Sequence, residues 1–546
     1  MHQNRNRLVV PFIILCLITA VVAAVPEAHD RTRSPGADVT TPGPVAIDGI
    51  GPGTLMIQGG GSTPDELMSF FFQRVGREKA RLVIIPTASA DAEKPAGWKE
   101  RWQKLGISDI TLLHTRDRQT ASKPVFVQPL REATGVWIAG GDKQRLADAY
   151  VGTLVEQELQ ALLRRGGVIW GTSAGAAIMS KLMIAGGNPP EANLSRGLDL
   201  LPGAVIDQHF LVRKREPRLL RVLNDHPGFV GIGVDEATAL VVHGRTMRVL
   251  GSSTVFILLA AGAERPLRRM VMDKKTPGDY TTLRKAALNR ASAPFPPKTV
   301  RTPEVPQGAL LIVGGGGMPV EVVNRYIELA GGKHKTFVVL PTSMPDPIPP
   351  NTGSFLRRAG VENVHVLTGR TREEVTKPEV LELLDKADAV WFDGGRQWRF
   401  VDAYEGTPFV DKLHGVLKRG GVIGGSSAGA TIQGEYLCRG NPLGPNDIIC
   451  EGYERGFSFL PGVGIDQHFT QRKRFKDMLH FKQTYPQYLG IGIDEATALV
   501  VRGNTAEIIG RTRACFYTGT PKDEMDFISV QAGEKIDLQT LKKVAK

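Results

Sequence analysis

A long internal duplication is the feature of this sequence that most constrains its fold. The segment GGVIWGTSAGAAIMS at 166–180 returns as GGVIGGSSAGATIQG at 420–434, and LPGAVIDQHFLVRKR at 201–215 returns as LPGVGIDQHFTQRKR at 460–474. The first pair is offset by 254 residues and the second by 259, which is the length of a whole domain and far longer than a solenoid repeat. A chain of 546 residues also exceeds what one hydrophobic core usually supports. We therefore predict one domain duplicated in tandem.

The segments outside the two copies predict how the chain is divided. An apolar stretch from Leu8 to Ala24 follows Arg5 and Arg7 and ends in small residues, a layout typical of a signal peptide, with a retained membrane anchor as the alternative. No other segment is apolar enough to cross a bilayer, so we expect an exported protein whose mature body makes no membrane contact. The predicted order is a signal peptide at 1–24, a flexible leader at 25–53, a first domain at 54–285, a proline-rich linker at 286–307 and a second domain at 308–546.

The charge balance narrows the set of partners. The formal net charge of +12 would suit a nucleic acid, a membrane surface or an acidic small molecule. Long basic runs with interleaved aromatic residues are missing, so we do not expect nucleic-acid binding. We attribute the excess of positive charge to solubility and to the attraction of anions.

Two of the cysteines lie at the ends of an insertion. Cys438 and Cys450 bracket CRGNPLGPNDIIC, which has no counterpart in the first copy. An oxidising compartment would allow these two thiols to form a disulfide, and the sequence leaves open whether they do. There is no spaced set of cysteines and histidines of the kind that binds zinc, and we expect neither a metal nor an organic cofactor.

Short apolar runs predict the fold of each copy. RLVIIP, GVWIAG, GGVIWG and GIGV lack the polar alternation of half-exposed strands, and they alternate with helical stretches such as GTLVEQELQALLRRGG. Strands of this kind are buried on both faces, which indicates an α/β fold with a mostly parallel sheet covered by helices. Ligands bind such sheets outside the carboxyl ends of the strands. The glycine-rich corners that follow the strands should therefore converge at that edge.

A serine lies at the sharpest of these corners in both copies. Ser173 and Ser427 are each the centre of a G-x-S-x-G pattern between a predicted strand and a predicted helix. A nucleophile elbow has this pattern because the strained turn leaves no room for side chains two residues before and after the serine. A tight turn that merely uses small residues is the alternative. Two copies in the same context favour the nucleophile.

A serine nucleophile needs a base, and the base needs an acid that orients it. His209 and His468 lie in the same IDQHF setting in the two copies, and a histidine that only packs at the end of a strand is the alternative. Two adjacent carboxylates are available in each copy: Asp235 with Glu236, and Asp494 with Glu495. Neighbouring residues on an extended strand point to opposite faces, so spacing alone does not choose between the members of a pair. The chain order Ser, His, acid argues against the common α/β-hydrolase fold.

Backbone N–H groups could stabilise the oxyanion of such a reaction. The N–H groups of Ala174 and Ala428 lie at the predicted start of the helix after each serine. A second donor could come from a pair of glycines, where no Cβ prevents close approach of the backbone. The candidate pairs are Gly140-Gly141 and Gly394-Gly395.

Together these motifs resemble cyanophycinases and, more broadly, the serine peptidase family that also includes aspartyl dipeptidase. The resemblance rests on GTSAGA and GSSAGA, on DQHF followed by RKR, on GGD before a helix and on GIGVDEATA, and it covers about 55–270 and 310–520. It implies two tandem three-layer α/β/α sandwich domains similar to class I glutamine amidotransferases. It also implies two catalytic triads, with the glutamates favoured over the aspartates: Ser173, His209 and Glu236, and Ser427, His468 and Glu495.

The resemblance further implies which residues hold the substrate. Cyanophycinases cleave a poly-aspartate backbone bearing arginine side chains into β-Asp-Arg dipeptides. The matching substrate-binding positions of the first copy are Gly141, Asp142, Lys143, Asp207, Gln208, Arg213, Arg215 and Arg218. Those of the second copy are Gly395, Gln397, Asp466, Gln467, Arg472 and Arg474. A solvated helix face is the alternative for the arginines.

The two copies depart from the family pattern in different ways. Lys143 stands where the family has a glutamine, whereas the second copy keeps Gln397 but has Arg396 in place of the preceding aspartate. The third arginine position of the first copy, Arg218, is Asp477 in the second. Because arginine forks suit carboxylates, we expect the copies to hold different ligands or to hold one ligand with different strength.

We therefore predict an exported, tandem-duplicated serine peptidase with two competent sites that acts on aspartyl-containing peptides or cyanophycin. Its expected partner is a peptide substrate of acidic or isoaspartyl character. A secreted amidase or acyl transferase on the same scaffold is one alternative, and a peptide-binding module without turnover is another. The duplication also allows the two copies to pack as an internal pseudo-dimer.

Overall fold

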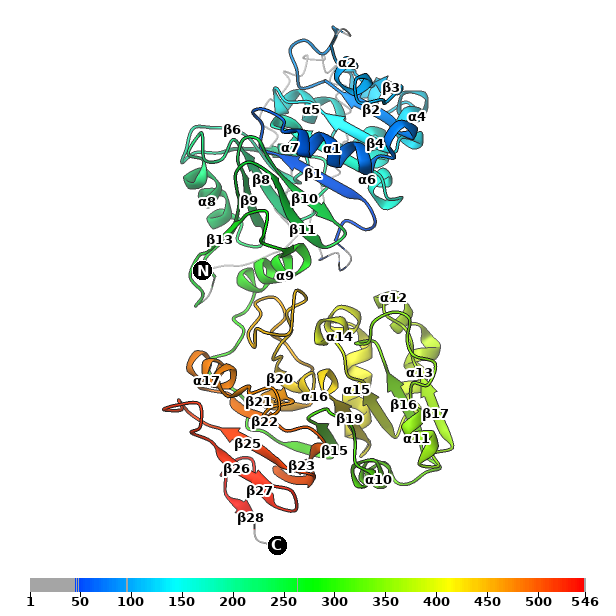
Figure 1. Cartoon of the computed structure of the whole chain (residues 1–546), viewed down its shortest axis with the longest axis vertical. Helices are drawn as coiled ribbons and strands as arrows, with labels where there is room; N and C mark the ends of the chain where they lie inside the picture. Colours follow the sequence, from blue (N-terminus) through cyan, green and yellow to red (C-terminus); the bar gives the residue numbers. More distant parts are fainter. Residues whose placement is uncertain (1–44, 46, 48, 95–96, 263, 545–546) are drawn as a thin grey trace, which may run out of the picture.

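The computed structural model describes residues 45, 47, 49–94, 97–262 and 264–544. The predicted signal peptide and most of the predicted leader lie outside the described residues. Figure 1 shows two α/β halves arranged one after the other along the longest axis, the first in blue to green and the second in green through yellow to red. Within the described ranges, no helix combines the length and the apolar character that a membrane span requires.

A sheet of eight strands forms the centre of the first half. The strands lie in the order β14 (Gly278–Asp279), β11 (Thr246–Gly251), β10 (Thr238–His243), β1 (Thr54–Gln58), β5 (Val168–Thr172), β4 (Gly135–Ile138), β2 (Arg81–Ile85) and β3 (Asp109–Leu112). From β1 to β3 all neighbours are parallel, whereas β10, β11 and β14 add antiparallel to the other side of β1. The predicted parallel sheet is thus present and is extended by antiparallel strands.

The second half repeats this plan with nine strands. They lie in the order β17 (Asn363–Val366), β16 (Thr336–Leu340), β18 (Ala389–Phe392), β19 (Val422–Ser426), β15 (Val305–Val313), β23 (Thr497–Gly503), β24 (Thr505–Gly510), β27 (Lys535–Asp537) and β28 (Lys543–Val544). Neighbours from β17 to β15 are parallel and those from β15 to β28 are antiparallel.

Helices cover both faces of each large sheet. Those of the first half are α1 (Asp65–Arg74), the 3₁₀ turn η1 (Arg77–Lys79), α2 (Glu100–Gln103), α3 (Arg118–Ala121), α4 (Pro124–Glu132), α5 (Lys143–Tyr150), α6 (Leu154–Arg164), α7 (Ala174–Ala177), α8 (Glu216–Asp225) and α9 (Tyr280–Ala291). Those of the second half are α10 (Val320–Leu329), α11 (Ser354–Arg358), α12 (Arg372–Val375), α13 (Pro378–Lys386), α14 (Gln397–Tyr404), α15 (Pro408–Lys418), α16 (Ala428–Thr431) and α17 (Phe475–Thr484).

Alternate residues of the central strands pack into two separate cores. Leu55 and Ile57 of β1 join a core with α4 and α6, whereas Met56 joins the core of α1 and α2 on the opposite face. Strands buried on both faces are what the continuous apolar runs indicate. The predicted α/β class, with helices in layers on either side of the sheet, is confirmed.

A smaller sheet beside each large one carries the strands before the histidine and the carboxylates. In the first half it contains β13 (Arg268–Met272), β12 (Val255–Leu259), β9 (Val230–Val234) and β8 (Ala204–Gln208), next to the hairpin of β6 (Leu182–Gly186) and β7 (Asn193–Arg196). In the second half it contains β20 (Gly434–Tyr436), β21 (Leu460–Gln467), β22 (Leu489–Ile493), β25 (Arg513–Tyr517) and β26 (Ile528–Gln531). We expected all of the motifs to end at one edge of a single sheet, but they do not. Two sheets meet at the site instead.

The segment between the halves is shorter than the predicted linker. Helix α9 continues to Ala291, past the predicted start at 286, because Leu283, Ala286 and Ala287 pack into the first half's core. Strand β15 begins at Val305. Between α9 and β15, the segment without helix or strand is therefore 292–304.

Charged side chains join the two halves, and Figure 1 shows α9 at the end of the first half that faces the second. Arg245, in the turn between β10 and β11, donates to Asp402 of α14 at 2.7 Å and lies 4.5 Å from the centre of the Trp398 ring. Lys285 of α9 donates to Glu405 at 2.8 Å. The second half's helix α14 is therefore held by residues of the first half.

These contacts are not reciprocal. The counterpart of Arg245 in the second half is Asn504, which donates to Asp537 of its own half at 2.7 Å. A two-fold pseudo-dimer would repeat each contact with the partners exchanged. The contact of Arg245 with the other half is not repeated by Asn504.

Candidate active site

Each serine lies on a strained corner between a strand and a short helix. Ser173 follows β5 with φ 52° and ψ −110°, and Ser427 follows β19 with φ 56° and ψ −109°. A positive φ is uncommon for a residue with a side chain and is typical of functional sites. A Cβ on Gly171 would lie 2.0 Å from the carbonyl oxygen of Gly175, and one on Gly175 would lie 2.3 Å from that of Ile138. The corner therefore requires glycine on both sides of the serine.

In the first half the serine, the histidine and the glutamate form a continuous chain of hydrogen bonds. Ser173 Oγ lies 2.8 Å from His209 Nε2, and His209 Nδ1 lies 2.5 Å from Glu236 Oε1. The histidine side chain is 10% exposed and that of the glutamate 33%. The ring can accept the serine proton at one nitrogen while its other N–H donates to the carboxylate.

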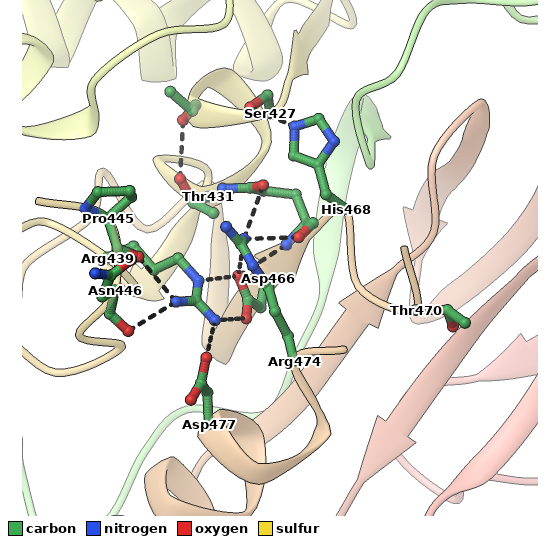
Figure 2. A network of polar contacts seen from close by, with 12 residues as sticks. Ser427, Thr431, Arg439, Pro445, Asn446, Asp466, His468, Thr470, Arg474 and Asp477 are labelled. Carbon is green, nitrogen blue, oxygen red and sulfur yellow. Dashed lines mark hydrogen bonds and ion pairs between the residues drawn. The ribbon is translucent and has the colours of Figure 1, made fainter. Parts of the chain in front are cut away.

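The second half repeats this chain. Ser427 Oγ lies 3.0 Å from His468 Nε2, and His468 Nδ1 lies 2.6 Å from Glu495 Oε1. Figure 2 shows the His468 ring beside the hydroxyl of Ser427. The exposed fractions of the two ionisable side chains, 9% and 35%, match those of the first half. The two sites thus have the same central geometry.

The adjacent aspartate and glutamate turn in different directions. Glu236 contacts the histidine, whereas Asp235 Oδ1 accepts a hydrogen bond from the backbone N–H of Leu211 at 3.1 Å. In the second half Asp494 accepts from the backbone N–H of Thr470 at 2.9 Å. The aspartates hold the loop after the histidine, and the glutamates are the carboxylates in contact with the ring.

A triple-glycine turn, to which our sequence analysis assigned no role, forms the floor of the first site. The carbonyl oxygen of Gly59 accepts from the N–H of His209 at 2.8 Å. A Cβ on Gly60 would lie 2.3 Å from His209 Cε1, and one on Gly61 would lie 2.9 Å from Glu236 Cβ. The imidazole and the carboxylate therefore pack directly on the backbone of this turn.

The same turn recurs at 314–316, where a Cβ on Gly315 would lie 2.3 Å from His468 Cε1. The signal that could have revealed it is the position of the two runs. Both GGG segments follow the central strand that lies parallel and adjacent to the strand of the serine.

The glycine pairs after β4 and β18 lie beside the serines. A Cβ on Gly140 would be 3.3 Å from Ser173 Cβ, and one on Gly394 would be 3.4 Å from Ser427 Cβ. Ala174 and Ala428, the predicted oxyanion donors, are the first residues of α7 and α16. These alanines directly follow the serines and the glycine backbones lie beside them, so both stay candidates for donating to the oxygen of a bound carbonyl.

Burial sets the protonation of the two histidines. It lowers the pKa of His209 and of His468 below the usual 6.5, against the opposing effect of the hydrogen-bonded glutamates. The positive charges of Arg213 and Arg472 lower the pKa further. Both rings are therefore neutral, and able to accept a proton, at neutral pH.

Three of the predicted substrate-binding residues of the first half lie in a buried ion-pair cluster. Asp207 is fully buried and accepts from Arg218 Nε at 2.9 Å and from Arg218 Nη2 at 2.5 Å. Arg215 lies 3.4 Å from the same carboxylate and donates to the carbonyl of Gln208 at 2.6 Å. The side chain of Arg218 is only 2% exposed. We expected these groups at a surface open to substrate, but a buried carboxylate requires charged partners, and the arginines supply them.

The second half builds an equivalent cluster from a different arginine, as Figure 2 shows. Asp466 accepts from Arg474 at 2.8 Å and from Arg439 Nε and Nη2 at 2.7 Å each. Arg439 comes from the insertion and also donates to Asp477 at 2.6 Å. The guanidinium that α17 lacks at position 477 is thus supplied by the inserted loop.

The position after each glycine pair differs between the halves. Lys143 is buried, its Nζ donates to the carbonyl of Ile184 at 2.8 Å, and burial lowers its pKa to about 8. Gln397, its counterpart, is also buried. Asp142 caps α5 by accepting from the N–H of Gln144 at 2.8 Å.

The remaining predicted substrate-binding groups lie around the histidines. Arg213 and Arg472 are exposed. The backbone N–H of Arg213 donates to the carbonyl of His209 at 3.0 Å, and that of Arg472 donates to the carbonyl of His468 at 2.9 Å. Gln208 and Gln467 are buried. Gln467 Oε1 accepts from Arg474 at 2.9 Å. The two exposed arginines are the guanidinium groups of this set that a substrate can reach.

The described cysteines form no disulfide in the structure. Cys438 and Cys450 are buried free thiols, so the disulfide that the sequence allowed is not formed. Burial raises the pKa of Cys450 to about 12. It also raises the pKa of Cys438 well above its usual value, so both thiols are unreactive. Among the residues that the structure describes, no group of three or more His, Cys, Asp or Glu side chains is placed to hold a metal ion.

Comparison with known proteins finds one family model that matches both halves. The model of peptidase family S51 matches residues 55–250 and again 310–509. A cyanophycinase from Nostoc sp. is 35% identical over 202 residues, which are 35% of this chain and 68% of that protein. A cyanophycinase from Geminocystis herdmanii is 33% identical over 205 residues, 35% of this chain and 74% of that protein.

Two solved structures are also similar to part of the chain. A peptidase from an acI-B1 Actinobacterium is 23% identical with a TM-score of 0.34, and the match covers 42% of this chain and 96% of that one. A putative peptidase E protein from Listeria monocytogenes is 16% identical with a TM-score of 0.28, and the match covers 37% of this chain and 99% of that one.

Proposed function

Both halves of the chain belong to peptidase family S51, and from that premise we propose an exported peptidase that hydrolyses aspartyl-containing peptides or cyanophycin to dipeptides at two sites. The chain is a serine-type peptidase and its substrate is a peptide. The observation that carries the proposal is the repeated chain of hydrogen bonds from a strained serine through a histidine to a glutamate.

Acylation starts at the serine. Ser173 Oγ attacks the carbonyl carbon of the scissile bond while His209 Nε2 takes the hydroxyl proton. Glu236 accepts the hydrogen bond of His209 Nδ1–H and stabilises the imidazolium that forms. The N–H of Ala174, with the backbone of the adjacent glycine pair, donates to the oxyanion, and each such donor contributes about 3 kcal/mol to the lowering of the barrier.

The same groups complete acylation and then carry out deacylation. Acylation ends when the imidazolium gives its proton to the leaving amine, which departs and leaves an ester on the serine. A water molecule then attacks the ester carbonyl as the neutral histidine accepts its proton. The serine regains its proton when the tetrahedral intermediate collapses and the acid product leaves. Ser427, His468, Glu495 and Ala428 carry out these steps in the second half.

The preference for aspartyl substrates is supported by exposed positive charge beside each histidine. Arg213 and Arg472 are exposed at the fourth position after the histidine, where a guanidinium can pair with a substrate carboxylate. The relatives named cyanophycinase point to the same class of substrate. Export is supported by the signal-peptide pattern of residues 1–24, which lie outside the described residues.

A substrate panel tests the proposal. The mature protein is incubated with cyanophycin, with isoaspartyl and aspartyl dipeptides, and with simple amides and esters, and the products are identified by mass spectrometry. We expect dipeptides from the polymer or cleavage after an aspartyl residue. Turnover confined to the amides and esters would favour an amidase or acyl transferase. Binding of peptides without any turnover would favour a binding module.

The pH dependence of kcat/KM gives a second test, because its acid limb reports the histidine of the free enzyme. A lowered pKa keeps the base unprotonated to lower pH, so we expect a midpoint below pH 6.5. Replacing Arg213 by glutamine in the Ser427→Ala protein removes a positive charge near His209, raises the histidine pKa and moves the midpoint to higher pH.

The matched control is Arg221→Gln in the same background. Arg221 is 67% exposed and pairs with Asp225, and its charge is not among the principal influences on the His209 pKa. Its midpoint should equal that of the Ser427→Ala parent. An acid limb that stays in place when Arg213 is replaced contradicts the assignment of His209 as the base.

A further inference from the structure

Three arginines surround the loop that lies next to the glycine pair of the second site. Arg399 donates to the carbonyl of Ser343 at 3.1 Å, and Arg370 donates to that of Met344 at 2.7 Å. The backbone N–H of Arg396 donates to the Ser343 carbonyl at 2.9 Å. The three residues are therefore gathered on one short segment.

This segment is directly connected to the serine. Ser343 Oγ donates to the carbonyl of Gly394 at 2.9 Å, and a Cβ on Gly394 would lie 3.4 Å from Ser427 Cβ. Arg396 follows Gly394 by two residues. The three arginines thus lie around the segment next to the serine of the second site.

The first half has the same arrangement with one charge reversed. Arg145 donates to the carbonyl of Ala88, as Arg399 does to that of Ser343, and Arg116 donates to the carbonyl of Ser89. The Nε atom of Arg145, however, lies 3.9 Å from a carboxylate oxygen of Asp142, the residue that Arg396 replaces in the second half. The matched positions are Asp91, Arg116, Asp142 and Arg145 in the first half, and Asp346, Arg370, Arg396 and Arg399 in the second.

The positive charge of these three arginines is only partly balanced by carboxylates. Asp346 pairs with Arg370 at 3.1 Å, but its side chain is 76% exposed. Neither Arg396 nor Arg399 has a carboxylate within ion-pair distance among the described residues, and Arg396 Nε is buried with no hydrogen-bond partner there. Burial and the charges of Arg370 and Arg396 lower the pKa of Arg399. The guanidinium groups of Arg396 and Arg399 donate to the backbone carbonyls of Asn441 and Ser343, but no carboxylate balances their charge among the described residues. An anion bound beside the reactive serine would supply that balance.

We propose that the two sites divide peptide substrates by charge. The second site selects peptides with a carboxylate close to the scissile bond, which Arg396, Arg370 and Arg399 bind. The first site, where Asp142 stands in place of one guanidinium, binds a carboxylate at this position more weakly. This proposal rests on the proposed function, since it requires both serines to react.

The test uses variants that each keep one serine. Ser173→Ala leaves the second site and Ser427→Ala leaves the first. Each protein digests a library of hexapeptides in which matched members differ by glutamate or glutamine at one position, and mass spectrometry measures the relative rates of consumption. We expect the second site to prefer the glutamate member by about tenfold, in keeping with one charge-assisted hydrogen bond, and the first site to show a smaller preference.

Charge exchange then assigns the effect to a residue. Adding Arg396→Asp to the Ser173→Ala protein should reduce the preference, and adding Asp142→Arg to the Ser427→Ala protein should increase it. Arg396→Gln serves as the second variant if the aspartate protein does not fold. Arg358→Asp, which changes an exposed arginine of α11, is the control for net charge and should leave the preference unchanged.

The outcomes separate this proposal from the proposed function. If neither single-serine protein consumes any peptide, the proposed function fails and this proposal with it. If both proteins consume peptides with equal charge preference, the function stands and the division by charge is wrong. The division is equally wrong if both replacements of Arg396 leave the preference of a folded second site unchanged.

Discussion

Alanine at both Ser173 and Ser427 is expected to reduce the kcat of peptide hydrolysis by a factor on the order of 10⁶, because no other group supplies the attacking oxygen. Each serine forms its own chain of hydrogen bonds to a histidine and a glutamate, so the sites are independent in their chemistry. Each single variant should therefore retain the turnover of the intact site. Steady-state kinetics on the preferred peptide measure all three proteins.

The control for the double variant replaces two exposed serines outside the sites, Ser122 and Ser292, by alanine. This protein should match the unmodified one in kcat and in KM. Thermal unfolding of each variant shows whether the fold is retained. Full activity in the Ser173→Ala, Ser427→Ala protein contradicts the assignment of either serine as nucleophile.

Alanine at Gly315 is expected to lower kcat of the second site by at least about 100-fold without removing the serine. Its Cβ would lie 2.3 Å from His468 Cε1, so the ring must move and lose its bonds to Ser427 and Glu495. Misplacement of a catalytic group by about 1 Å costs on the order of 10² in rate. The measurement is kcat in the Ser173→Ala background, where the first site does not contribute.

Gly317 provides a matched control in the same turn. Its φ is 99° and that of Gly315 is 96°, but nothing lies within 4 Å of a Cβ on Gly317. Alanine there imposes similar backbone strain without reaching the histidine, so its kcat should stay within a few-fold of the parent. Equal losses in the two variants would show that strain, and not displacement of the ring, is responsible.

The fold class, the family and the serine peptidase chemistry could be predicted because their signals are local. The glycine two residues before Ser173 is required by a contact within the same corner, with the carbonyl of Gly175, so this part of the pattern can be read from consecutive residues. The continuous apolar runs report burial on both faces of a strand, which Leu55 and Met56 show by entering opposite cores. The duplication strengthens each signal by repeating it.

Features that depend on distant segments could not be predicted in the same way. Asp235 and Glu236 are adjacent, and their directions follow from a loop whose N–H groups hold the aspartate. The role of Gly60 depends on contact with His209, which is far away in the sequence and follows a strand of another sheet. The directions of the two carboxylates leave no mark in the local sequence. The repeated GGG run marks a turn but does not show which side chain packs on it.

The buried arginines show the same limit. RKR after the histidine suggested groups open to substrate, but Arg474 is turned inward by the carboxylate of Asp466. The aspartate at position 477, where the first copy has an arginine, suggested that the copies hold different ligands or hold one ligand with different strength. In the structure, Arg439 of the insertion occupies the equivalent place. An insertion that completes a buried ion pair cannot be recognised before the two segments are seen together.

Labelling with a fluorophosphonate tests most directly whether both serines are activated nucleophiles. The reagent phosphonylates a serine only where a base removes its proton, and intact-protein mass spectrometry counts the adducts. We predict two adducts on the unmodified protein, at Ser173 and Ser427, one on each single alanine variant and none on the double variant. A folded, unmodified protein that takes up no label at either serine would contradict the account.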